Sequence, residues 1–173
     1  MKKTILRKYA NLIVHCGANV QKGQSVLVLA DLDQPEFVQM VVDEAYKAGA
    51  AEVTVQWNYQ PLSKIHYRYR TVKSLGTVKE WEKARQEYYC DVIPARIILV
   101  SEDPDGMKGI NMEKVSKARR MSYPVLKPYI DRRENKEQWC IAAVPGAAWA
   151  KKVFPGERTS TAIEKLWENI LYT

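Results

Sequence analysis

The sequence predicts an α/β fold in which helices cover both faces of a mostly parallel sheet. Short apolar runs alternate along the chain with segments in which apolar residues recur at helical spacing. Two of the runs, 25–30 and 97–100, are continuously apolar, which is typical of strands buried on both faces. Strands that alternate with helices form βαβ units, and these units build parallel sheets.

Four strands are expected, at 25–30, 52–57, 97–100 and 139–144. In the second of them valine and tryptophan alternate with polar residues, so this strand should have one wetter face and lie near an edge of the sheet. The order of elements favours a three-layer sandwich of the Rossmann or flavodoxin type. No repeat, low-complexity tract or obvious linker interrupts the sequence, so residues 1–173 are expected to form a single domain.

Helices are expected before the first strand and between the strands. Three helix starts are predicted from capping boxes, in which a side chain at the helix start and a Glu three residues later satisfy each other's backbone N–H groups. These pairs are Asp33 with Glu36, Thr77 with Glu80, and Thr161 with Glu164. Asn111 can cap a further helix, which Pro124 and Pro128 are expected to break or kink. Residues 60–76 are the least regular stretch.

The composition is that of a soluble globular protein, with 46% hydrophobic and 27% charged residues. No apolar run approaches the roughly 20 residues that span a bilayer. Arg7 and Lys8 interrupt the N-terminal apolar stretch, so no signal peptide is expected. We therefore expect a cytoplasmic protein without a membrane partner. The net charge of +7 fits either a nucleic-acid partner or a fragment whose acidic partner domain is missing.

Neither the cysteines nor the histidines form a pattern typical of a metal or redox site. Cys16, Cys90 and Cys140 are widely spaced, and the apolar runs around Cys16 and Cys140 favour small core residues in a reducing compartment. His15 and His66 are isolated, and a structural role at the end of the first helix suits His15. The sequence has no nucleophile elbow and no phosphate-binding glycine loop. We therefore expect no catalytic, cofactor-binding or metal-binding residue in this chain.

Carboxylates gather at the predicted carboxyl ends of two strands, where parallel sheets bind ligands. Asp31 and Asp33 follow the first strand, and Glu102 and Asp103 follow the third. Together they could hold a magnesium ion, as in a receiver-like small-ligand domain. The favoured alternative is that Asp33 and Asp103 cap the helices that follow them.

Basic segments support another alternative, a nucleic-acid-binding α/β module. Residues 65–70 read Ile-His-Tyr-Arg-Tyr-Arg, which combines aromatic and cationic side chains as single-strand binding platforms do. Lys117–Arg120 and Arg132–Arg133 add positive charge. A tyrosine–arginine run is more often a solvated face whose aliphatic stems pack on the fold, so nucleic acid is the less favoured partner.

Several segments carry, in order along the chain, a resemblance to a known family. They are Tyr9–Ile13 with Gln21–Gln24, Ala45–Ala50 with Val53–Val55, Trp139 with Pro145 and Trp149–Pro155, and Leu166–Ile170. This ordered set resembles the N-terminal domain of the thermophilic-type metalloaminopeptidases, the aminopeptidase T and S group of leucyl-type exopeptidases. The resemblance runs from near the start of the chain to its last residues.

The resemblance implies a function that the residues themselves do not show. Members of this family are dimeric exopeptidases that remove N-terminal residues from peptides with a pair of divalent metal ions. Their ligands are carboxylates, histidines and a tyrosine of a second domain, so none can be placed on residues 1–173. The chain is therefore expected to be a truncated, non-catalytic half that is inactive alone. It should pack on a C-terminal catalytic domain of the same polypeptide and help to shape its cleft.

Overall fold

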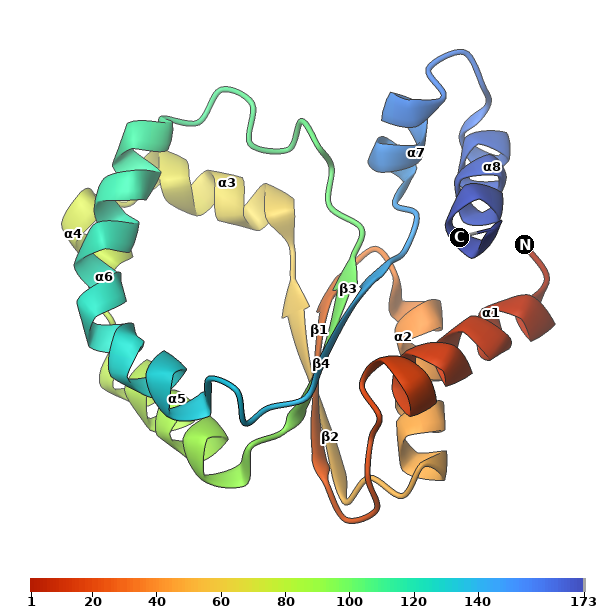
Figure 1. The fold of residues 1–173 in the computed structure, drawn as a ribbon. Helices are drawn as coiled ribbons and strands as arrows, with labels where there is room; N and C mark the ends of the chain where they lie inside the picture. The colour runs from red at the N-terminus through yellow and green to blue at the C-terminus, as the bar shows by residue number, and fades with distance from the viewer. Residues whose placement is uncertain (173) are drawn as a thin grey trace. The chain divides into compact units, whose positions relative to one another are not determined.

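The computed structural model describes residues 1–172, which form two compact units (Figure 1). The sheet unit comprises Met1–Tyr59, Pro94–Asp105 and Gln138–Thr173, and the helical unit comprises Gln60–Ile93 and Gly106–Glu137. Two separate stretches of the sequence therefore interrupt the sheet unit to build the helical unit. A single domain over 1–173 stays a prediction, because contact-defined units can belong to one folding domain.

Among the described residues, the sheet unit contains a parallel sheet of four strands in the order β2-β1-β3-β4. The strands are β1 (Ser25–Asp31), β2 (Glu52–Asn58), β3 (Ala95–Val100) and β4 (Trp139–Ala143). Their positions and their parallel pairing confirm the predicted α/β class. The continuous apolar runs became the central strands β1 and β3, and the alternating run became the edge strand β2.

Helices of the sheet unit pack on one face of the sheet (Figure 1). In chain order the helical segments of this unit are α1 (Lys3–Asn11), the π-helical turn η1 (Leu12–Gly17), α2 (Pro35–Lys47), α7 (Ala147–Val153) and α8 (Thr159–Tyr172). Val28 and Ile97 of the sheet are fully buried beneath them. Three aromatic rings from different helices meet at centroid distances between 5.5 and 5.9 Å: Tyr9, Phe37 and Trp167. Such rings bury large apolar areas, so this cluster joins α1, α2 and α8.

The π-helical turn explains where two of the cysteines lie. A Cβ on Gly17 would lie 2.5 Å from the Sγ of Cys140, so glycine allows η1 to approach β4 closely. Burial raises the pKa of the Cys140 thiol, which therefore stays protonated at neutral pH. The prediction that Cys16 belongs to the core is wrong, because its side chain is exposed. The apolar run around Cys16 lies in η1, where Ile13 and Val14 are buried and Cys16 points to the surface.

The helical unit consists of α3 (Gln60–Tyr69), α4 (Val72–Gly76), α5 (Glu80–Val92) and α6 (Met112–Arg133). The long helix α6 packs against both α4 and α5. A Cβ on Gly76 would lie 2.9 Å from the carbonyl oxygen of Ala118, so glycine allows α4 to cross α6 at close range. Neither α6 nor any other described helix is both long enough and apolar enough to span a membrane.

This unit differs from expectation at two places. Residues 60–76, which were interpreted as the least regular stretch, are helical in α3 and α4, and Leu62, Ile65 and Tyr69 of α3 recur at helical spacing. Of the two effects expected of Pro124 and Pro128, a break in the helix is wrong, since α6 continues through both to Arg133. The two prolines leave the carbonyl oxygens of Arg120 and Pro124 without an N–H donor. Both of these residues are exposed, so water can satisfy the two oxygens.

The three predicted capping boxes are also wrong, whereas the Asn111 cap is confirmed. The Asn111 Oδ1 accepts a hydrogen bond from the Lys114 backbone N–H at 3.0 Å. Helix α2 begins after Gln34, α5 begins after Lys79, and α8 begins at Thr159. Each start differs by one to three residues from the predicted cap, because short-range capping patterns are weaker than the packing that fixes a helix.

Candidate functional site

The carboxyl edge of the sheet is the first candidate site, because open parallel sheets bind ligands outside the carboxyl ends of their strands. Asp31 ends β1 and Asn58 ends β2. Ser101 follows β3 directly, and Gly146 lies three residues after β4. Parallel pairing of the four strands thus brings four distant segments to one edge, and three of them carry polar side chains there.

A hydrogen-bond network connects these groups. Asn58 Nδ2 donates to Asp31 Oδ1 at 2.7 Å. The backbone N–H of Ser101 donates to Asp31 Oδ2 at 3.3 Å. The Ser101 hydroxyl lies 3.2 Å from the same oxygen and 2.7 Å from Asp33 Oδ1. A hydroxyl has one proton to donate, so the shorter distance favours the bond to Asp33. Ser101 is only 3% exposed, and it holds the two aspartates against the sheet.

The network does not include the other two predicted carboxylates. Asp103 Oδ1 accepts from the backbone N–H of Asp105 at 2.9 Å, and Asp105 pairs with Lys152 at 2.6 Å. Within residues 1–172, no group of three His, Cys, Asp or Glu side chains is arranged to hold a metal ion. The hypothesis that Asp31, Asp33, Glu102 and Asp103 together bind a magnesium ion therefore lacks a geometric basis. The capping alternative is wrong as well, since neither Asp33 nor Asp103 caps a helix.

His15 has a structural setting, as its position at the end of the first helical segment predicted. Its Nε2 lies 3.7 Å from Oε2 of Glu44, a nearly buried carboxylate on α2. Bonds from Lys47 and then from Asn11 lower the pKa of Glu44, so it carries a negative charge at neutral pH. These contacts join α1 and η1 to α2.

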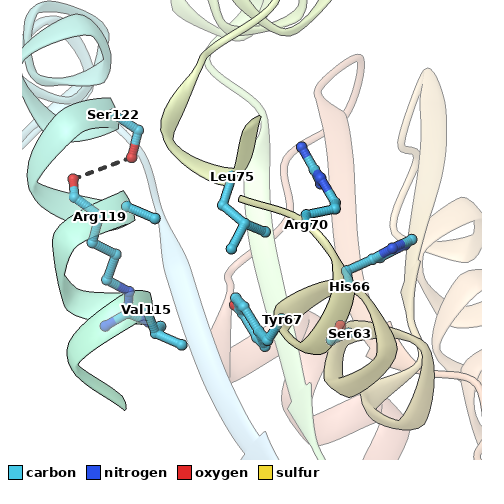
Figure 2. A pocket seen from close by; sticks show the side chains of 9 residues that line it. Ser63, His66, Tyr67, Arg70, Leu75, Val115, Arg119 and Ser122 are labelled. Carbon is cyan, nitrogen blue, oxygen red and sulfur yellow. Dashed lines mark hydrogen bonds between the residues drawn. The ribbon is translucent and has the colours of Figure 1, made fainter. Parts of the chain in front are cut away.

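A pocket of about 220 Å³ between α3, α4 and α6 is the second candidate site (Figure 2). It is lined by His66, Tyr67 and Arg70 of the first basic segment and by Arg119 of the second. Figure 2 shows Tyr67 pointing toward α6 and His66 pointing away from it. Arg70 is held by Ser74, because its Nε donates to the Ser74 hydroxyl at 3.1 Å and its Nη2 donates to the Ser74 carbonyl. The fold thus brings together two basic segments that are far apart in the sequence.

The third basic segment is not available for a ligand. Arg132 pairs with Glu87 at 2.6 Å and with Asp91 at 3.4 Å. Arg133 is buried, and it donates to Gln86 Oε1 at 2.9 Å. These two arginines hold α6 against α5.

The net positive charge of the chain lies in one unit. The helical unit contains 16 Lys and Arg against 8 Asp and Glu, a net charge of +8. The sheet unit contains 11 against 12, a net charge of −1. The composition of the whole chain hid this separation, because the helical unit is built from two stretches that are not adjacent in the sequence.

Comparison with known proteins matches the chain along its whole length. The family described as thermophilic metalloprotease (M29) matches residues 2–173. Aminopeptidase PepS of Streptococcus thermophilus is 35% identical over 173 residues, which are 99% of this chain and 42% of that protein. Aminopeptidase AmpS of Bacillus subtilis is 37% identical over 168 residues, which are 95% of this chain and 40% of that protein.

A solved structure has the same fold. Wild-type AmpT from Thermus thermophilus matches with a TM-score of 0.86 and 29% sequence identity, over 98% of this chain and 43% of that chain. The chain therefore spans about two-fifths of the length of these relatives, and the matched region is their N-terminal part.

Proposed function

This chain belongs to the thermophilic metalloprotease family M29, as the ordered resemblance predicted, and from that premise we propose that it is the non-catalytic N-terminal part of a metal-dependent aminopeptidase. The observation that carries the proposal is the extent of the similarity. It covers 95–99% of this chain and only 40–42% of proteins named aminopeptidases. We further propose that the whole enzyme is a cytoplasmic dimer that removes N-terminal residues from peptides.

The residues of this chain do not fit a centre of two divalent metal ions. Such a centre needs several carboxylate or imidazole ligands that converge within a few ångströms. In the described part of the chain, two aspartates converge on a serine and no third ligand joins them. We therefore assign the metal ions, and the hydrolysis they support, to the region of the relatives that lies beyond the match.

The helical unit is the part of this chain that we propose to pack on the catalytic region. Exposed large apolar side chains are stabilised when a partner covers them. Among residues 1–172, ten of the 21 large apolar side chains that are exposed lie on the helical unit: Leu62, Ile65, Tyr69, Trp81, Tyr88, Met112, Met121, Tyr123, Val125 and Ile130. Packing of this surface on the catalytic region helps to shape its cleft in the proposed enzyme.

The experiment that tests this function compares the chain alone with a chimaera. Residues 1–173 are joined to the part of Bacillus subtilis AmpS that lies beyond its match, and hydrolysis of leucine p-nitroanilide is followed with Zn²⁺, Co²⁺ or Mg²⁺. We expect the chimaera to be active and EDTA to abolish that activity. We expect the chain alone to be inactive with every ion, because it cannot build a metal-bound nucleophile.

The same AmpS part without this chain is the matched control, and it should be less active than the chimaera. Chelator-sensitive hydrolysis by the 173-residue chain alone would show that the metal site lies within it. A chimaera that folds, as judged by circular dichroism, and is no more active than the control would show that this chain does not support the catalytic region.

One observation favours a second function, a nucleic-acid-binding module. The net charge of +8 on the helical unit suits a phosphate backbone, and the affinity of such a module falls steeply with salt. The receiver-like alternative has less support, because Glu102 and Asp103 lie outside the network around Ser101. Magnesium-dependent thermal stabilisation, lost in Asp31→Asn, would support it.

A further inference from the structure

The pocket of the helical unit lies among segments that carry almost no negative charge. Residues 60–79, which include α3 and α4, contain five Lys and Arg and no Asp or Glu. The first half of α6, residues 112–122, adds four Lys and Arg against one carboxylate. That carboxylate, on Glu113, already pairs with Lys117 at 2.7 Å. An anion that approaches the pocket is therefore attracted by both segments.

Arg119 is the cation at this pocket that the fold leaves available. Among the described residues, its guanidinium has no hydrogen-bond or ion-pair partner. The neighbouring cations are occupied, since Arg70 is bound to Ser74 and the Lys114 Nζ donates to the backbone oxygen of Arg68 at 3.3 Å. A guanidinium presents a planar set of donors that matches the two oxygens of a carboxylate.

One part of the pocket lining is apolar and lies beside the polar groups of Ser63, His66, Arg70, Arg119 and Ser122. The apolar part consists of Leu75, Val115 and Ala118 with the ring of Tyr67, and Figure 2 shows Tyr67 directed toward α6 with Leu75 next to its ring. The pocket volume of about 220 Å³ is below the roughly 300–1,000 Å³ of pockets for drug-sized ligands. It therefore suits one amino-acid side chain, whereas a nucleic-acid strand needs a long groove with successive stacking rings. The combination fits an apolar group that carries a carboxylate.

We propose that this pocket binds the C-terminal residue of a short peptide. The apolar side chain of that residue lies on Leu75, Val115 and Ala118, and its α-carboxylate binds the guanidinium of Arg119. Many ligands carry a carboxylate, and the inference that this one is a peptide rests on the proposed aminopeptidase function. In that enzyme the pocket favours short substrates with an apolar residue at the end opposite the bond that is cleaved.

Peptide binding to the 173-residue chain can be measured by NMR titration without any enzymatic activity. The probe is the tripeptide Ala-Ala-Leu, and its C-terminal amide is the matched ligand without a carboxylate. We expect the amide to bind about tenfold more weakly, because the charged hydrogen bond to Arg119 is lost. Ala-Ala-Asp should also bind more weakly than Ala-Ala-Leu, because its side chain places a charge on an apolar surface.

The decisive variant is Arg119→Gln, and Arg120→Gln is its control because Arg120 neighbours Arg119 in α6 and does not line the pocket. Both side chains are exposed, so neither variant should unfold the chain. We expect Arg119→Gln to weaken Ala-Ala-Leu binding about tenfold, Arg119→Lys to recover part of the loss, and Arg120→Gln to have little effect.

Several results would overturn the proposal. They are equal binding of the acid and the amide, equal loss in both glutamine variants, inorganic phosphate binding as tightly as Ala-Ala-Leu, and the absence of any shift with millimolar peptide. Salt-sensitive binding of a thymidine oligonucleotide that both glutamine variants weaken equally, and that exceeds peptide binding, would assign the surface to nucleic acid instead. Because the titration uses the chain alone, its failure is distinct from an inactive chimaera.

Discussion

Gly146 allows the segment after β4 to pass close to the residues that end β1 and β3. A Cβ at this position would lie 2.3 Å from the carbonyl oxygen of Ser101 and 3.0 Å from Oδ2 of Asp33. The backbone angles of Gly146, φ −74° and ψ 153°, are ones that any residue adopts. Glycine is therefore required here by lack of space. The nearest atom belongs to the backbone, which cannot move aside as easily as a side chain.

We predict that Gly146→Ala lowers the free energy of unfolding by roughly 1–3 kcal/mol, the usual cost of overpacking. Gly156→Ala is the matched control, since a Cβ there meets nothing within 4 Å and φ is not positive. It should leave the free energy of unfolding unchanged or raise it by about 0.4–1 kcal/mol. Urea unfolding followed by circular dichroism measures both values. Equal midpoints for the two variants would contradict the close approach at the carboxyl edge.

A site residue could be predicted only where its position along the chain determines its position in the fold. Asp31 and Asp33 were expected at the carboxyl edge, because residues that directly follow a buried strand must lie there. Ser101 was missed, although its position directly after β3 was a usable signal. The meeting of Arg70 and Arg119 at one pocket could not be predicted, because it depends on how α3 and α4 pack against α6.

At the scale of elements, α6 is continuous although its sequence contains Pro124 and Pro128. Proline in a helix interior costs about 3 kcal/mol, because its ring clashes with the preceding turn and a hydrogen bond is lost. Yet Val115 and Ala118 on α6 are buried, and Arg133 near its end is buried against α5. Packing along the length of the helix outweighs the local preference.

We therefore predict that Pro124→Ala raises the free energy of unfolding by about 1–3 kcal/mol, because it restores an N–H donor to the exposed carbonyl of Arg120. Ser116→Ala, at another exposed position of the same helix, should change stability by less than about 0.5 kcal/mol. Thermal and urea unfolding of the two variants are compared. A Pro124→Ala variant no more stable than the unsubstituted chain would show that the helix needs a kink at this residue.

The strands could be predicted from the sequence and the helix boundaries could not, for a physical reason. The four strands were placed correctly because apolar runs such as 25–30 and 97–100 supply the side chains that the central strands bury, although β3 is fully buried on one face only. Residues 60–76 were missed because the apolar residues of α3, Leu62, Ile65 and Tyr69, are few and exposed, and α3 has no buried residue. Neither the apolar runs nor the helical spacing could predict the division into two units, because that division arises from contacts between distant segments.

At the scale of the whole molecule, core and charge are divided unequally between the units. Of the 27 buried apolar residues in the described part of the chain, four belong to the helical unit: Tyr89, Cys90, Val115 and Ala118. The sheet unit has the aromatic cluster and both central strands. Local stability follows the density of buried apolar contacts, so the helical unit should open more easily than the sheet.

Hydrogen exchange tests this difference, and it connects with the proposed function. In the chain alone, we predict that amides of α3 and α4 are at least about tenfold less protected than those of β1 and β3, because few apolar contacts hold the two helices. In the chimaera with the catalytic region of AmpS, the exposed apolar surface of the helical unit is covered. Protection of α3 to α6 should then rise by more than that of β1 and β3, whose amides gain only the increase in the free energy of global unfolding.

The pattern of this change separates packing from general stabilisation. A ligand or partner that binds only the folded chain raises protection of every amide that exchanges through global unfolding. Contact with the helical unit has an additional effect there, because it also suppresses the local opening through which those amides exchange. Equal rises in β1, β3 and α3 would therefore show that the catalytic region stabilises the chain as a whole. A rise confined to the sheet unit would show that the catalytic region packs on the sheet instead.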